Sequence, residues 1–524
     1  MRKLLLLILC LTCAQAIADD KPQLWLYCPI NLQVDENIPK AAEIWKRAAA
    51  AGYTHVLLTD SKMAKLGDLG GMEKTYFANV EKIKKLAAEL KLEIVPALFN
   101  IGYSNNMLWH DPNLAEGLPV KDQPFIVQDG QAKPTGQIDF PKKPNFHDDS
   151  VHLEGNLATA KDNRDVARLI YGFKVPQYRC YHISVQIKTD DYSAQPEIKA
   201  IGAANGNRTL QWQHLGVKRT QDWTRHDVIF NSLDNDQFSL YFGVWGSGKG
   251  TLQWKDWKIE EAGLVNVLRR EGAPCTVKTE DGKTLVEGKD YEPIIDTKLG
   301  NHPWKGEYDA WHEPVTIKTK LPSGTKLLVS WHHPAIVYDG QVSACISDPK
   351  TNALLADEAQ RVKAAWGAAG YMMQHDEFRT LGWDASCEHS HKTPGQLLAD
   401  NARYCTQLLG SSQAYVWNDM FDPFHNAVKG PYYLVNGPWT DSWEGLDKNV
   451  VIVNWNFGKR DESLKFFADR GHKQLIAGYY DGPMSDAKSW AASAAKVQGV
   501  IGYMYTTWRG DYSQMEAYAK ASGR

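Results

Sequence analysis

The chain contains 524 residues, 43% of them hydrophobic, and carries a formal net charge of −3. This length and apolar content allow a large buried core and more than one domain. The near-neutral charge gives no sign of a nucleic-acid groove or a polybasic membrane surface, so neither partner is expected. The 19 Trp and 23 Tyr supply flat amphipathic rings that suit ligands such as sugars, although most aromatic side chains pack in cores.

The N-terminus is typical of a secretory signal. Arg2 and Lys3 precede an apolar run at 4–11, and the small residues within 14–18 form candidate cleavage sites. We therefore predict a signal peptide over residues 1–18 and a secreted or periplasmic mature chain. No later stretch approaches the roughly 20 apolar residues that a spanning helix needs, so no membrane contact is expected after signal removal.

The cysteine pattern does not predict a metal site. Six cysteines remain after signal removal, and no CxxC pair or other metal-ligand spacing occurs among them. Buried thiols, with a disulfide or two among them, are favoured, and no cofactor is predicted. The histidine pairs at 332–333 and 389–391 also lack the spacing of metal ligands. The six cysteines are Cys28, Cys180, Cys275, Cys345, Cys387 and Cys405.

Strands and helices alternate in the first part of the chain. Apolar strands are predicted at 24–28, 55–60 and 93–98, with amphipathic helices at 38–51 and 72–90 between them. This alternation is typical of a parallel sheet.

The alternation then stops for about 250 residues, which is too long for a structureless loop in a compact domain. Short alternating strands predict an antiparallel, jelly-roll-like β-sandwich over 137–262, and a β-rich connecting segment follows over 263–350. The sandwich resembles a carbohydrate-binding module in texture. Its tryptophans could stack on sugars, but alternating strand positions favour a place in the core: Trp212, Trp223, Trp245, Trp254 and Trp257.

Strand and helix alternation resumes after the insertion. Five further strands are predicted, which makes eight and indicates an α/β fold, a (β/α)8 barrel interrupted after its third strand. The barrel is expected to comprise 19–136 and 351–524, while an apolar strand at 327–331 is assigned to the insertion. The five strands lie at 371–374, 414–417, 450–455, 474–479 and 501–505.

Two adjacent acids, Asp376 and Glu377, follow the fourth predicted strand. In an α/β barrel the carboxyl ends of the strands carry the chemistry. Carboxylates beside tryptophan suit cleavage of a glycosidic bond, which needs a proton donor, stabilisation of an oxocarbenium-like centre and rings that hold the sugar. Further acids and aromatics follow the other strands: Tyr27, Asp60, Trp417, Asp419, Trp455, Tyr479, Tyr480, Asp481 and Trp508.

The adjacency of the two acids constrains the mechanism. Consecutive side chains on a strand point to opposite faces, so Asp376 and Glu377 are not expected to flank one anomeric carbon as nucleophile and acid. They can act on different groups of the substrate. If Glu377 protonates the leaving oxygen while Asp376 holds a 2-acetamido group, the substrate's own carbonyl becomes the nucleophile.

The motifs His375-Asp376-Glu377, Trp417-Asn418-Asp419, Tyr479-Tyr480-Asp481 and Trp508 resemble those of the family 20 β-N-acetylhexosaminidases. The resemblance covers the barrel motifs only. It implies that Asp376 orients the acetamido group and that Glu377 is the general acid/base. The residues expected to bind substrate are His375, Trp417, Asp419, Trp455, Tyr479, Asp481 and Trp508.

Two features depart from that family. A sugar-binding Glu usually follows the final Trp of the family by two positions, whereas this chain has Trp508-Arg509-Gly510-Asp511. The family tends to carry its accessory domain before the barrel, and here the β-rich domains are predicted inside it. The chain therefore resembles a relative of that clan rather than an ordinary member.

Two alternatives remain open. One is a retaining glycosidase of another barrel family, with Glu377 as the acid and Asp419 or Asp481 as the nucleophile. The other is a carbohydrate-binding protein without activity. All three hypotheses predict an oligosaccharide or glycan as the partner, and none predicts an oligomeric state.

Overall fold

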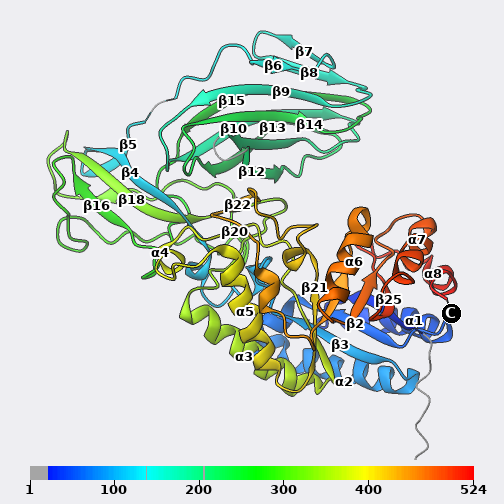
Figure 1. Cartoon of the computed structure of the whole chain (residues 1–524). Helices are drawn as coiled ribbons and strands as arrows, with labels where there is room; N and C mark the ends of the chain where they lie inside the picture. Colours follow the sequence, from blue (N-terminus) through cyan, green and yellow to red (C-terminus); the bar gives the residue numbers. More distant parts are fainter. Residues whose placement is uncertain (1–21, 137, 204–206, 524) are drawn as a thin grey trace, which may run out of the picture.

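The computed structural model describes residues 22–136, 138–203 and 207–523. The predicted signal peptide lies outside the described residues. The chain forms a barrel, a two-sheet β-domain and a third sheet between them (Figure 1). Within the described ranges, no helix has the length and apolar character needed to cross a membrane.

Eight parallel strands close into a barrel, in agreement with the number and positions predicted. The strands neighbour one another in chain order, and the first pairs with the last, with Gln23 opposite Gly502. The two-sheet domain and the third sheet both lie between the third and fourth barrel strands in sequence. The barrel strands are β1 (Gln23–Pro29), β2 (His55–Thr59), β3 (Glu93–Leu98), β19 (Gly370–Met373), β21 (Gln413–Trp417), β23 (Val451–Asn454), β24 (Gln474–Ala477) and β25 (Val500–Tyr505).

Helices follow most of the barrel strands, but not all of them. Between β21 and β23 the chain forms η5 (Asp419–Phe421), β22 (Leu434–Val435) and η6 (Ser442–Gly445), with no α-helix. This connection contains three prolines and several glycines. Both disfavour helices, because proline lacks a backbone N–H and glycine loses more backbone conformational entropy on folding. The described fold therefore departs here from one helix per strand. The helices are α1 (Asn37–Ala50), α2 (Glu73–Leu90), α3 (Pro349–Trp366), α4 (Ala385–Glu388), α5 (Pro394–Leu409), α6 (Arg460–Asp469), α7 (Met484–Ala494) and α8 (Met515–Ala521).

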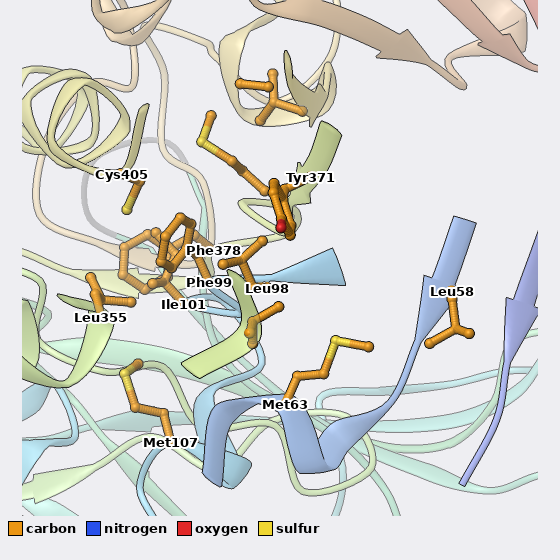
Figure 2. Packing of buried hydrophobic residues seen from close by; sticks show 14 of the residues in the cluster. Leu58, Met63, Leu98, Phe99, Ile101, Met107, Leu355, Tyr371, Phe378 and Cys405 are labelled. Carbon is orange, nitrogen blue, oxygen red and sulfur yellow. The ribbon is translucent and has the colours of Figure 1, made fainter. Parts of the chain in front are cut away.

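Side chains on the barrel strands alternate between two cores, as the period of two requires. In β1, Trp25 and Tyr27 belong to the cluster inside the barrel, whereas Leu24 and Leu26 pack in the layer between strands and helices. Figure 2 shows part of this outer layer, where side chains from strands, helices and connecting loops meet. Burial of these apolar side chains, each worth about 1.5–3 kcal/mol, fixes the positions of the strand ends.

The β-domain of the insertion contains two antiparallel sheets of five strands each. Their buried side chains form one apolar cluster, as expected for a sandwich. Trp254 is buried in this cluster and Trp257 packs against it, while Trp212, Trp223 and Trp245 are half-buried. One sheet has the order β13-β10-β15-β8-β7 and the other β12-β11-β14-β9-β6. The strands are β6 (Phe146–His147), β7 (Val151–Glu154), β8 (Leu157–Lys161), β9 (Ala167–Lys174), β10 (Cys180–Asp190), β11 (Glu197–Gly202), β12 (Arg208–His214), β13 (Gln221–Asn231), β14 (Gln237–Val244) and β15 (Thr251–Glu261).

The third sheet has the order β16-β18-β4-β5-β17 and joins segments from both sides of the sandwich. Its longest pairing is between β4 (Gly117–Gln128) and β18 (Lys326–Pro334). The predicted boundary at 136 groups β4 and β5 (Gln131–Pro134) with the barrel, whereas these strands pair with the connecting segment. The remaining strands are β16 (Thr276–Thr279) and β17 (Ile317–Lys318).

Candidate functional site

A cavity of about 420 Å³ lies at the carboxyl ends of the barrel strands. Its wall is contributed by the ends of nearly all the strands and by the loops that follow them. Asp376 and Glu377 are the acids among the described residues that line it. The lining residues are Tyr27, Asn100, Tyr103, Gln374, Asp376, Glu377, Trp417, Trp455, Ala477, Tyr480, Thr506 and Trp508.

Asp376 and Glu377 line the same cavity, which differs from the expectation that they point to opposite faces. Strand β19 ends at Met373, so neither acid belongs to the strand. Glu377 adopts a left-handed backbone conformation with a φ of 47°, which non-glycine residues rarely do. This turn redirects its side chain, and the alternation rule for strands does not apply to the pair. Strained conformations of this kind cluster at functional sites.

The carboxylate of Glu377 is held by two neighbours. Nη2 of Arg379 lies 2.8 Å from Oε1, and the Tyr103 hydroxyl donates to Oε2. Nη1 of Arg379 also donates to the Tyr103 hydroxyl oxygen at 3.1 Å, so the three groups form a closed ring of contacts. The side chain of Arg379 is 3% exposed and that of Glu377 is 29% exposed. The carboxylate is therefore fixed at the cavity wall yet remains open to a ligand.

Arg379 connects the site to the insertion. Its guanidinium lies 4.2 Å from the ring centroid of Tyr338, and it donates to Oε1 of Gln341. Nε2 of Gln341 donates to the Glu377 carbonyl oxygen at 2.9 Å. The Tyr338 backbone N–H donates to the carbonyl oxygen of Trp212 in β12 at 2.8 Å, so the sandwich supports this turn directly.

Asp419 lies beneath the acids rather than in the cavity wall. It is fully buried, and its Oδ2 accepts the Glu377 backbone N–H at 2.8 Å and an Asn426 side-chain N–H at 3.0 Å. Burial and the nearby Asp376 raise the pKa of Asp419 well above its usual range. Its observed contacts fix the backbone at Glu377.

Asp376 carries the clearest electrostatic signature in the cavity wall. Burial, with a smaller contribution from the negative charge of Glu377, raises its pKa from about 3.8 to about 7. Nearby Arg379 opposes this shift. A pKa near 7 suits acid–base catalysis at neutral pH, because both protonation states of the carboxyl are then populated.

Aromatic rings form the opposite part of the wall. Trp455 and Tyr480 stack with centroids 5.6 Å apart and an interplanar angle of 3°. Trp508 packs against Tyr27 at 5.0 Å, while Trp417 is largely buried at the base. Tyr480 and Trp508 are 46% and 51% exposed, so their faces are accessible. Rings of this kind suit the apolar face of a sugar.

Besides Asp419, three predicted substrate-binding residues lie outside the cavity lining: His375, Tyr479 and Asp481. His375 is fully buried, and its Nε2 lies 3.1 Å from Oδ1 of Asn401. Tyr479 is buried and stacks on Tyr505 at 4.1 Å, and its neighbour Tyr480 lines the cavity instead.

The carboxylate of Asp481 accepts hydrogen bonds from the loop that follows the last barrel strand. Its Oδ2 accepts the Trp508 N–H at 2.6 Å and its Oδ1 accepts the Thr507 hydroxyl at 2.6 Å. These contacts place Trp508 at the cavity, although Asp481 does not line it. Like Asp419, Asp481 is positioned to hold a loop.

Several contributors were missed by the sequence analysis. Asn100 and Tyr103 follow the third barrel strand closely, so the same rule that selected Asp376 could have found them. Arg379 follows the acids by two positions and could have been read as their counter-charge. No sequence signal pointed to Gln341, because it lies in the connecting segment.

Gly102 makes a close approach that its lack of a side chain permits. A Cβ atom at this position would lie 2.2 Å from the Asp376 carbonyl oxygen, a backbone atom that cannot move freely. We expect Gly102→Ala to displace the loop that carries both acids. If these acids are catalytic, kcat/KM should fall by at least about tenfold, since small misplacements of catalytic groups are costly. Gly71→Ala is the control, because nothing lies within 4 Å of its Cβ position. Equal activity of the two variants would contradict the prediction, with melting temperatures reporting on folding.

Known proteins resemble this chain in structure, but the comparisons assign it to no family. No family model matches the chain, and no curated protein matches it. The chain is similar to a rhamnosidase from Novosphingobium sp. PP1Y at 12% identity and a TM-score of 0.32, covering 96% of this chain and 59% of that one. It is similar to a β-N-acetylhexosaminidase from Bacteroides fragilis NCTC 9343 at 17% identity and a TM-score of 0.25, covering 36% and 44%. A carbohydrate-binding module of Cellvibrio mixtus lichenase 5A, in complex with cellotriose, aligns at 13% identity and a TM-score of 0.18, covering 24% of this chain and 97% of the module.

Proposed function

We propose that the protein is a glycoside hydrolase that uses Asp376 and Glu377 to cleave a glycan. The observation that carries the proposal is the cavity itself, which combines two adjacent acids with exposed aromatic rings at the carboxyl ends of barrel strands. Residues 1–18 support a secreted or periplasmic location, and the sandwich over 137–262 is proposed as a carbohydrate-binding-module-like domain.

The proposed substrate is a β-linked 2-acetamido sugar, cleaved by an exo-acting enzyme with substrate assistance and retention of configuration. A protein nucleophile would have to come from a carboxylate in the cavity wall. Asp419 and Asp481, the two candidates from sequence, lie outside the described lining and hold backbone N–H groups instead. Their placement favours a nucleophile supplied by the substrate.

In the proposed first step, the acetamido carbonyl oxygen attacks the anomeric carbon as the bond to the leaving oxygen breaks. Glu377 gives its proton to that oxygen, and Asp376 accepts a hydrogen bond from the acetamido N–H and balances the oxazolinium charge. Water then attacks the anomeric carbon, Glu377 takes a proton from it, and the acetamido group is restored. Trp417, Trp455 and Trp508 hold the sugar.

One observation favours a second assignment in the same cavity. Glu377 forms an ion pair with Arg379, whereas burial raises the pKa of Asp376 to about 7. In this alternative Asp376 is the proton donor, and Glu377 remains ionised as a nucleophile or electrostatic stabiliser. A 2-acetamido group would then not be required.

A substrate panel tests the requirement for the acetamido group. We expect the protein to hydrolyse aryl N-acetylglucosaminides or N-acetylgalactosaminides and to be inhibited tightly by the matching thiazoline, because its ring resembles the oxazolinium intermediate. The matched plain aryl glycosides should remain intact. Turnover of the plain glycosides only, or hydrolysis of hexosaminides without thiazoline inhibition, would exclude substrate assistance.

The dependence on the leaving group identifies the proton donor. If Glu377 is the acid, Glu377→Gln should lower kcat/KM by about 10²–10⁴-fold on a poor leaving group and much less on dinitrophenol, which leaves without protonation. Asp376→Asn should lower both rates strongly and to a similar extent. The reverse pattern would assign the acid to Asp376. Circular dichroism of both variants checks that they fold.

The pH dependence of kcat/KM also distinguishes the two roles of Asp376, because each role requires a different protonation state. As the orienting residue, Asp376 works ionised, so kcat/KM should rise as pH increases through about 7, because the raised pKa keeps the carboxyl protonated below that value. Asp376→Asn should remove this acidic limb. The loss of activity at high pH, where the general acid Glu377 loses its proton, should persist in Asp376→Asn. A fall in kcat/KM as pH increases above about 7, also removed by Asp376→Asn, would instead mark Asp376 as the proton donor.

A further inference from the structure

Two cysteines and two acids meet at a buried point outside the cavity lining. The four side chains are those of Glu116, Cys345, Asp384 and Cys387, here called the thiol–carboxylate cluster. One donor atom from each lies within 4.8 Å of the other three, and all four residues are buried. Glu116 directly precedes β4, and Asp384 caps the short helix α4 that contains Cys387. The catalytic mechanism uses none of them.

Three of the six separations among these atoms match tetrahedral coordination. The two Sγ atoms are 3.9 Å apart, Sγ of Cys345 is 3.6 Å from Oδ1 of Asp384, and Sγ of Cys387 is 3.5 Å from Oε2 of Glu116. A tetrahedral zinc ion with Zn–S bonds of about 2.3 Å and Zn–O bonds of about 2.0 Å separates two sulfurs by about 3.8 Å, and sulfur from oxygen by about 3.5 Å. All three measured distances agree with these values.

In Glu116 and Asp384, the carboxylate oxygen that does not contact a thiol is bound by surrounding groups. Oε1 of Glu116 accepts the backbone N–H groups of Gly382 at 2.8 Å and Trp383 at 2.9 Å. Oδ2 of Asp384 pairs with the guanidinium of Arg270. The other oxygen of each acid lies beside a thiol of the cluster, and Oδ1 of Asp384 also accepts the Cys387 backbone N–H at 3.1 Å. Such supporting contacts orient the ligands of metal sites.

The charge of the cluster also calls for a cation. Two acids and two thiols are buried together, and Arg270 is the cation paired with them. A divalent cation at the centre would balance this charge while taking thiolates and carboxylates as its ligands.

We propose that the thiol–carboxylate cluster binds one Zn²⁺ ion in a structural site. Four protein ligands complete a tetrahedral shell, so no position remains for a substrate or a reactive water. Mixed sulfur and oxygen donors favour zinc over calcium or magnesium, which prefer oxygen ligands alone. The ion would tie the loop before β4 and the segment after β18 to residues 380–388, which follow the catalytic loop in sequence.

Metal analysis of the full-length mature protein tests the proposal. We expect stoichiometric zinc after purification, or after incubation with Zn²⁺ and removal of the excess. Replacement by Co²⁺ should give thiolate-to-cobalt charge-transfer absorption, and a strong chelator should lower the melting temperature. Cys387→Ser should lose most of the bound metal, whereas the matched control Cys275→Ser, a half-buried thiol outside the cluster, should retain it.

The competing states of the two thiols are distinguished by peptide mass spectrometry on the wild type. A disulfide between Cys345 and Cys387, or free thiols in a protein that takes up neither Zn²⁺ nor Co²⁺, would overturn the proposal. If Cys387→Ser does not fold, the cobalt spectrum of the wild type decides the question, because thiolate charge transfer requires a cysteine ligand. Bound zinc that gives no such band on cobalt replacement would place the ion elsewhere and also overturn the proposal.

Discussion

The arrangement of the cavity depends on one buried positive charge. The guanidinium of Arg379 is almost inaccessible to water and cannot lose its proton, so anionic and polar groups must surround it. Glu377 supplies the negative charge, Tyr103 and Gln341 supply oxygens, and Tyr338 supplies a ring face. These partners come from parts of the chain that are far apart in sequence. Removing one partner of a buried ion pair typically costs about 3–5 kcal/mol, and partial exposure of Glu377 reduces that figure here.

Much of the barrel could be predicted because its strands are short apolar runs separated by amphipathic helices. The acids could be found because they follow such a run directly. The geometry of the pair could not be predicted, since the alternation rule holds only within a strand and β19 ends at Met373, before both acids. Tyr479 was predicted from the resemblance to the family motif, whereas the neighbouring Tyr480, which has a left-handed backbone just after β24, lines the cavity.

Features that depend on contacts between distant parts of the chain could not be predicted from local sequence patterns. The connection between β21 and β23 lacks an α-helix, and only its prolines and glycines hinted at this. The thiol–carboxylate cluster draws ligands from three separate segments, and only Asp384 and Cys387 are near neighbours. A search for local metal-ligand spacing therefore could not detect it. Gln341 was missed for the same reason, because folding alone brings the connecting segment to the barrel.

The pairing of Tyr338 with β12 has a consequence for how such a chain can evolve. Strand β12 lies at the edge of its sheet, and Tyr338 pairs there with Trp212 and His214 through backbone hydrogen bonds of 2.8 Å and 3.3 Å. An edge strand presents unpaired backbone groups that otherwise need covering. Exchanging this sandwich for another module would leave the turn that carries Gln341 without its support. The sandwich is thus a structural support of the cavity rather than an interchangeable accessory.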